Sequence, residues 1–307
     1  MNKLEQKHIS LVEQYLTDNC RLLEKKLFDY HIKDADTKDV LFALKLYQNK
    51  DGGFGQGLES DFRFPDSSPM ATSIGLRILS KLEKTEEVSK MIKKAVQYLE
   101  STYDEDRKGW YAVPKVVNDY PHTPWWHYDE DEKMTVIDKN WGNPTAELIA
   151  YLYKYRKYIS DLDIMNLVEH AVNYIDDKSN FNSENEVFCF IKLYNIVPKK
   201  YQIRIKEHLS NAVSQVIEYD ENKWEEYVPL PLHFIKTSDQ FKFKIKEKKI
   251  QSNLDYYVKT IKEKTMIDPP WGKSFYKDGL RRAYEEWKGV LTLEALEVLN
   301  NFDRIKK

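Results

Sequence analysis

The chain has 307 residues, which is enough to bury a sizeable core as one large repeat-built domain or as two ordinary ones. Its 48 basic and 50 acidic residues give a formal charge of -2, which offers no basic surface to nucleic acid or to an anionic membrane. Because the sequence shows no apolar stretch of about 18 residues and no signal-peptide pattern, we expect a cytoplasmic protein without a transmembrane segment.

Hydrophobic periodicity predicts a chain that is almost entirely helical. In chain order, helices are expected over residues 4–28, 37–48, 69–82, 86–103, 144–157, 161–177, 184–195, 200–218, 251–264 and 289–301. Segment 229–240 contains two prolines and is left unassigned. Loop 109–143 has neither helical nor strand periodicity, and a loop of this length inside a domain is often a binding loop or a lid.

The turns between the predicted helices share one form, in which an aspartate is followed within a few residues by an aromatic side chain. They are Asp51–Gly55, Asp106–Trp110, Asp138–Gly142, Asp220–Trp224 and Asp268–Gly272. Three of them precede an apolar helix that contains a small residue and leucines. A recurring helix–turn–helix unit predicts stacked helix pairs that share a continuous core, and five or six pairs fit this length.

The best copy of this unit lies in Gln48–Leu82, with the pattern Gln-x-x-Asp-Gly-Gly-Phe-Gly followed by Ala-Thr-x-x-x-Leu-x-x-Leu. It resembles the repeat of the terpenoid cyclase and protein prenyltransferase β-subunit superfamily, with partial matches at 138–152 and 268–301. The GLE-x-D-x-R-x-P-x-SS pattern that follows is similar to a segment of uncharacterised bacterial proteins of this superfamily, so the resemblance does not specify an activity. The resemblance implies an all-α, single-domain α/α toroid over residues 1–307, with inner and outer helices around a central cavity.

The segment Glu59-Ser60-Asp61-Phe62-Arg63 is the first candidate for chemistry. Alternation along an extended segment would place Glu59, Asp61 and Arg63 on one side. Two neighbouring carboxyl groups titrate separately, so one can act as a general acid while Arg63 keeps the other ionised. The alternative is that Arg63 pairs with both acids and only braces a surface loop.

Loop 109–143 supplies the second candidate, Trp125-Trp126-His127. The two tryptophans can wall an apolar pocket or stack on a sugar or a carbocation, and His127 is the loop histidine best placed to act as a base. The alternative is an aromatic plug that fills the core. Further candidate ligand contacts, each with packing as its alternative, come from the repeated turns and their neighbourhood: Phe54, Trp141, Asn143, Trp271 and Trp287.

Other templates fit poorly. The run Asp129–Glu132 only faintly resembles the Asp-x-Asp-Asp acid of class II terpene cyclases, and four consecutive acids are typical of a solvated surface. The prenyltransferase zinc site needs an aspartate two positions before a cysteine, and Val187 occupies that position before Cys189. No other set of soft or imidazole ligands converges, so we predict no metal and no cofactor.

Three functions remain open from the sequence. The first is binding of an apolar or isoprenoid-like small molecule in a central aromatic-lined cavity, with cyclase- or transferase-like acid–base catalysis by the carboxylate pair. The second is a glycan-active toroid enzyme, either a lyase or a hydrolase, which would use aromatic platforms and paired carboxylates. The third is a binding or scaffold protein that has kept the fold without the chemistry.

Overall fold

The computed structural model describes residues 2–306, and these residues form an all-α protein. None of its helices is both long and apolar enough to span a bilayer. The α-helices are α1 (Gln6–Asn19), α2 (Leu22–Lys33), α3 (Thr37–Leu44), α4 (Pro69–Leu79), α5 (Glu86–Ser101), α6 (Gly142–Lys154), α7 (Ile164–Asp177), α8 (Glu184–Ile196), α9 (Lys199–Val216), α10 (Pro231–Phe234), α11 (Glu247–Lys264) and α12 (Ala283–Asn301). The strands β1 (Tyr128–Asp129) and β2 (Met134–Thr135) pair antiparallel in one short hairpin.

The chain divides into two compact units. Unit 1 combines the residues up to Ala43 with those from Ile217 onward, and unit 2 is the continuous segment Leu44–Val216. The single-domain organisation expected from the sequence stays a prediction.

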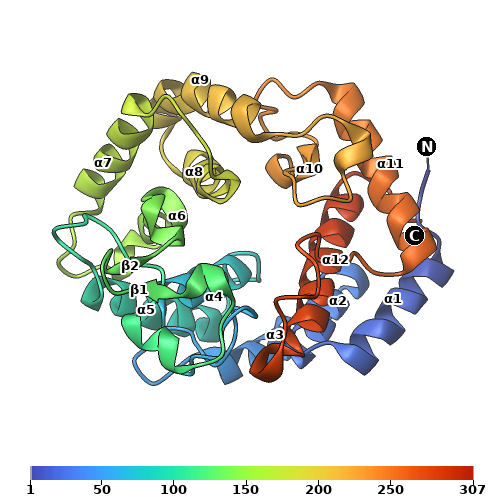
Figure 1. The fold of residues 1–307 in the computed structure, drawn as a ribbon, viewed down its shortest axis with the longest axis horizontal. Coiled ribbons are helices and arrows are strands. Elements are labelled where there is room, and N and C mark those ends of the chain that lie inside the picture. Colours follow the sequence, from blue (N-terminus) through green and yellow to red (C-terminus); the bar gives the residue numbers. More distant parts are fainter. Residues whose placement is uncertain (1, 307) are drawn as a thin grey trace. The chain divides into compact units, whose positions relative to one another are not determined.

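Unit 2 has two layers of helices (Figure 1). Helices α4, α6 and α8 lie side by side in one layer, and α5, α7 and α9 pack behind them in the other. This arrangement follows from the sequence, because each helix of the second layer buries one apolar stripe, such as Val88, Met91 and Ile92 of α5. Helix α6 is different, since nearly every residue from Gly142 to Leu152 is buried.

Unit 1 is assembled from both ends of the sequence. Helix α2 packs against α12, while α1 contacts both of them and α11 contacts α10 and α12. Leu4 pairs with Ile305 in a parallel bridge, and the almost fully buried Arg304 donates a hydrogen bond of 2.8 Å to the carbonyl of Asn2. These contacts hold the two terminal segments together, and an ion pair of 2.7 Å between Arg304 and Asp255 joins them to α11.

Most expected helices are present within a few residues of their predicted limits, with one clear error. Residues 4–28 were expected to form one helix, whereas α1 ends at Asn19 and α2 begins at Leu22. The Asn19 side chain donates a hydrogen bond to the carbonyl of Tyr15, and Cys20 is extended. Asparagine competes in this way for backbone groups and favours helix ends, and the periodicity of apolar residues does not detect this.

Candidate functional site

Two loops of unit 2 that are distant in sequence meet beside helix α4. Phe62 forms an antiparallel bridge with His122, flanked by hydrogen bonds from Arg63 N–H to Pro121 O (2.8 Å) and from Thr123 N–H to Asp61 O (2.9 Å). The candidate acids and the candidate aromatic residues are therefore neighbours in space.

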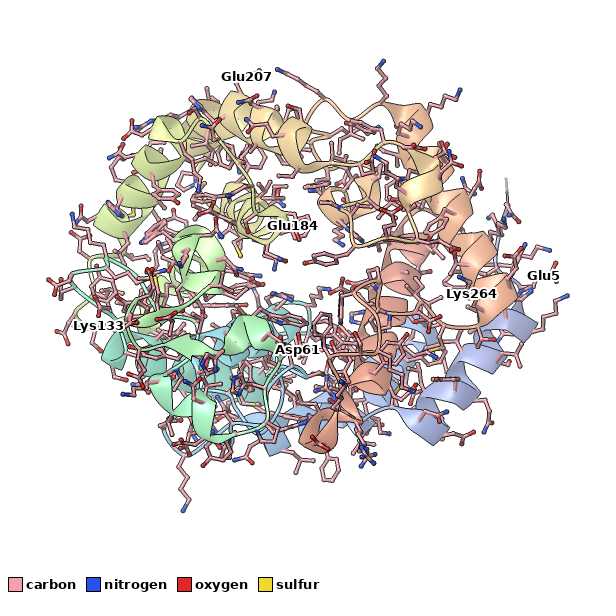
Figure 2. All side chains as sticks on the ribbon, viewed as in Figure 1. Glu5, Asp61, Lys133, Glu184, Glu207 and Lys264 are labelled. Atoms are coloured by element: carbon pink, nitrogen blue, oxygen red, sulfur yellow. The ribbon has the colours of Figure 1, made fainter. Side chains whose placement is uncertain are left out.

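The Asp61 carboxylate is the centre of this arrangement, and Figure 2 marks its position. Its Oδ2 accepts a hydrogen bond of 2.9 Å from the indole N–H of Trp125. Glu59 and Asp61 are both buried, with exposed fractions of 5% and 4%. A predicted acid and a predicted pocket-wall residue are thus in direct contact.

The conformation of residues 59–63 differs from the extended segment that the alternating pattern predicts. Glu59 Oε1 accepts a hydrogen bond of 3.1 Å from the Asp61 N–H, which closes a local turn. The Arg63 guanidinium lies over Gly57, whose φ of +72° favours glycine. Local side-chain-to-backbone bonding has overridden the strand-like alternation here.

Trp126 belongs to the core. It packs edge-on against Phe62 with ring centroids 5.3 Å apart, within a cluster that includes Phe64, Met70 and Val117. Its indole N–H is buried and has no hydrogen-bond partner among the described residues, and the same is true of the Thr123 hydroxyl. Buried unpaired polar atoms cost about 1–3 kcal/mol each, so a polar ligand atom or a water near this loop would relieve a real penalty.

His127 is exposed and forms a pair with His122. The two rings are nearly parallel, and His122 Nε2 lies 3.1 Å from His127 Nδ1. Because His122 Nδ1 lies 2.7 Å from the carbonyl of Tyr120, it carries the proton, and His127 Nδ1 must then donate to His122 Nε2. With both rings neutral, the nitrogen left without a proton is Nε2 of His127.

Phe54 lies away from these loops, in the core of the first repeat turn. It has no exposed surface, and three atoms of its ring lie within 2.6 Å of the place where a Cβ on Gly75 would stand. Asp51 accepts hydrogen bonds from the Gly53 N–H and the Ser67 hydroxyl and so fixes the turn. A ligand could not touch Phe54 without a rearrangement of the core.

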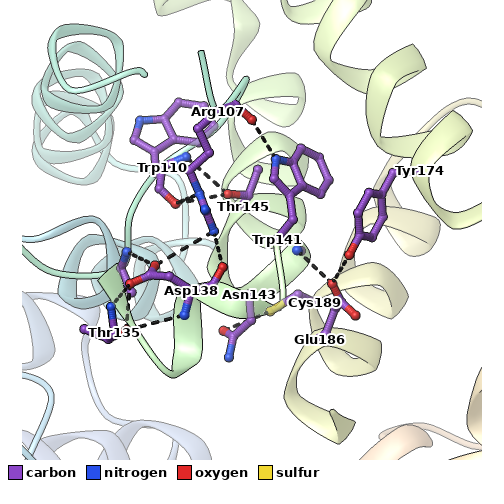
Figure 3. A network of polar contacts seen from close by, with 12 residues as sticks. Arg107, Trp110, Thr135, Asp138, Trp141, Asn143, Thr145, Tyr174, Glu186 and Cys189 are labelled. Carbon is purple, nitrogen blue, oxygen red and sulfur yellow. Dashed lines mark hydrogen bonds and ion pairs between the residues drawn. The ribbon is translucent and has the colours of Figure 1, made fainter. Parts of the chain in front are cut away.

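Trp141 and Asn143 belong to a separate polar network of unit 2 (Figure 3). The Trp141 indole donates to the carbonyl of Arg107 at 3.0 Å, and its ring packs against Tyr174. Asn143 Oδ1 lies 3.8 Å from the thiol of Cys189.

Two buried carboxylates hold the network of Figure 3 together. Asp138 accepts from Ala112 N–H at 2.7 Å and from the Thr135 hydroxyl at 2.6 Å. Glu186 accepts from Gly142 N–H at 3.0 Å and pairs with Lys178 at 2.6 Å. The aspartate of this repeat turn is therefore structural, because it fixes the loop that precedes α6.

Trp271 and Trp287 meet in unit 1. Their rings are edge-on with centroids 5.1 Å apart, and the Trp271 indole donates to the Tyr276 hydroxyl at 2.5 Å. Both tryptophans flank a small core cluster of Tyr276, Leu280 and Ala283.

The acidic run Asp129–Glu132 lies on the surface at the β1–β2 hairpin. Asp129 Oδ1 accepts from the N–H groups of Asp131 and Glu132, and these bonds lower the pKa of Asp129. Glu130 and Glu132 pair with Lys115 and Lys139. The solvated-surface interpretation of this run agrees with these contacts.

A third cluster, which joins α4, α6 and α8, was not predictable from the sequence pattern. Glu147 of α6 is buried and accepts two hydrogen bonds from Arg77 of α4, at 3.0 and 2.9 Å. Lys192 of α8 pairs with the same carboxylate at 2.7 Å. Each residue looks like an ordinary charged position in an amphipathic helix, and only the packing of three helices brings them together.

The thiol of Cys189, beside this cluster, is not expected to be reactive. Burial, reinforced by the Glu147 charge, raises the pKa of Cys189 to about 12, so its thiol stays protonated. In unit 1, burial and the nearby Glu24 likewise raise the pKa of Cys20 to about 12. No group of three or more potential metal ligands occurs within residues 2–306.

The Glu147 cluster predicts a specific acid dependence of stability. Burial alone would raise the pKa of Glu147, but Arg77 and Lys192 outweigh it and lower the pKa from 4.5 to about 2. Because the native state then binds fewer protons than the unfolded state, the stabilisation is complete above the unfolded pKa and is lost as the pH falls towards 2. It amounts to about 3 kcal/mol.

Urea unfolding of wild type and Glu147→Gln across this acidic range tests the expectation. The difference in unfolding free energy between the two proteins should shrink by about 3 kcal/mol as the pH falls. A difference that does not change with pH would contradict the assignment.

Comparison with protein-family models, with curated proteins and with solved structures finds no match to this chain. Function must therefore be argued from the geometry described above.

Proposed function

We propose that the chain is an α/α-toroid protein of the terpenoid cyclase and protein prenyltransferase type that binds an apolar, isoprenoid-like small molecule. Glu59 and Asp61 are its proton-handling pair, Arg63 is their electrostatic partner, and Trp125 forms the pocket wall beside them. His127 serves as a second base at the edge of the site.

The observation that carries this proposal is the hydrogen bond between Trp125 and the buried Asp61 carboxylate. An acid next to an aromatic wall, shielded from water, is the environment that general acid–base catalysis on an apolar substrate requires. The two layers of α-helices in unit 2 are consistent with the paired helices of a toroid.

The ligand that copurifies with the protein tests the proposal. The protein is denatured gently, extracted with organic solvent, and the extract is analysed by mass spectrometry. An isoprenoid or similar apolar compound is the expected result. A bound sugar would favour the glycan-active alternative, and an empty protein would favour the scaffold alternative.

Asp61→Asn separates chemistry from binding. Asparagine keeps an oxygen that can accept the Trp125 hydrogen bond but cannot transfer the proton, so turnover of the identified compound should fall by about 10²–10⁴-fold. Binding and thermal stability should change little. Asp119→Asn, at an exposed acid of the same unit, is the matched control and should behave like wild type. Full activity of Asp61→Asn would rule out its catalytic role.

A further inference from the structure

Lys192 is the second cation that contacts the Glu147 carboxylate, which already pairs with Arg77. Arg77 engages both oxygens of Glu147 through two hydrogen bonds, which is the complete bidentate geometry of an arginine–carboxylate pair. Lys192 then adds a further positive charge to the same group at 2.7 Å. A buried carboxylate needs one such partner for charge balance, so the lysine is surplus to the ion pair.

The Lys192 side chain is partly exposed on the layer formed by α4, α6 and α8. The side chain of Lys192 is 29% exposed and that of Arg77 is 33% exposed, whereas Glu147 is only 1% exposed. An ammonium group has three N–H donors, and Glu147 lies on one side of it. A second anion can therefore approach Lys192 without displacing the Glu147 contact.

Within residues 2–306, the ionisable side chains next to the Glu147 cluster are uncharged or already paired. Cys189 stays protonated because burial raises its pKa to about 12, and burial likewise raises the pKa of Tyr151 well above its usual value. Glu186 is paired with Lys178. Partial burial, and then the charge of Arg77, lower the pKa of Lys192, and a bound anion would offset both effects.

Apolar side chains flank the two cations on the same helix faces. Phe188 lies one helical turn before Lys192 on α8, and Ile74 and Ile78 lie beside Arg77 on α4. All three are partly exposed, although the neighbouring positions of both helices are buried. The layer of α4, α6 and α8 thus places the Lys192 ammonium group next to partly exposed apolar side chains.

We propose that Lys192 binds the carboxylate head of an amphiphilic ligand whose hydrocarbon part lies over Phe188, Ile74 and Ile78. This second site, on α4, α6 and α8, is distinct from the Asp61–Trp125 site, and the ligand that it selects is an apolar carboxylic acid. A single surplus cation matches a monoanion, whereas a diphosphate carries more negative charge than Lys192 can balance.

Calorimetric titration with dodecanoate and with dodecanol, which has the same chain and no charge, tests the proposal. Wild type should bind dodecanoate at least about tenfold more tightly than dodecanol, the value of one charge-assisted hydrogen bond. Lys192→Met should lose this preference and keep its affinity for dodecanol. Its fold should persist because the Arg77–Glu147 pair remains, and circular dichroism checks this. Lys192→Arg should restore the preference.

Lys93→Met, on the exposed face of α5, is the matched control and should keep the wild-type preference. If dodecanol binds but dodecanoate has no advantage, or if Lys192→Met keeps the advantage, the carboxylate assignment is wrong while the apolar-ligand proposal stands. If neither amphiphile binds to wild type, the Lys192 proposal is contradicted, while the Asp61 proposal is decided by the copurifying compound and by Asp61→Asn.

Discussion

Arg77→Met is expected to lower the free energy of unfolding by about 1.5–3 kcal/mol, because hydrogen bonds to a charged group are lost while Lys192 still balances the Glu147 charge. The substitution removes both hydrogen bonds that Arg77 donates to the buried Glu147 carboxylate and leaves Lys192 as its remaining cation. Urea unfolding at neutral pH measures the loss. Lys90→Met is the matched control, because Lys90 forms an exposed pair with Glu86, and it should cost less than about 1 kcal/mol.

A second variant separates charge burial from simple loss of packing. If the cost of Arg77→Met comes from weaker compensation of the buried Glu147 charge, Arg77→Met combined with Glu147→Gln should recover a large part of it, because the amide needs no counter-charge. Additive losses in the double variant would mean that Arg77 stabilises the protein through its packing alone.

Phe54→Ala is expected to destabilise the protein by about 3–5 kcal/mol, because it opens a cavity at a fully buried side chain that packs against Gly75. Thermal and urea unfolding measure the effect. Phe42→Ala removes an exposed ring, 65% accessible, and should change stability by no more than about 0.5 kcal/mol. A stable Phe54→Ala variant with altered ligand binding would instead restore Phe54 as a ligand contact.

The helical class and most helix positions were predictable from the sequence because amphipathic periodicity determines them. Helices α5 and α7 show this most clearly, with apolar stripes that become their buried faces. The break between α1 and α2 was not predictable from periodicity, because the apolar pattern continues across Asn19 while its side chain bonds backward to Tyr15. Such local competition is invisible when only apolar residues are counted.

The candidate site was predictable in part. The sequence singled out Asp61 and Trp125 separately, and their hydrogen bond shows that the two loops lie together, while the roles assigned to these residues stay predictions. It could not separate Trp125 from its neighbour Trp126, whose ring is core, because adjacent residues in an irregular loop have no fixed period of exposure. The Glu147 cluster was not predictable, because it forms only when Arg77 and Lys192 from two other helices pack against Glu147.

Unit 1 is formed by two segments that are far apart in the sequence, and this affects how the chain folds during synthesis. Helices α1 and α2 emerge from the ribosome early, yet both pack against α12, which is translated near the end. The continuous segment Leu44–Val216 contains its own packing partners and can fold in the meantime. We therefore expect that in nascent chains that stall before α12 the segment Leu44–Val216 is folded. Helices α1 and α2 would then expose apolar side chains and bind chaperones.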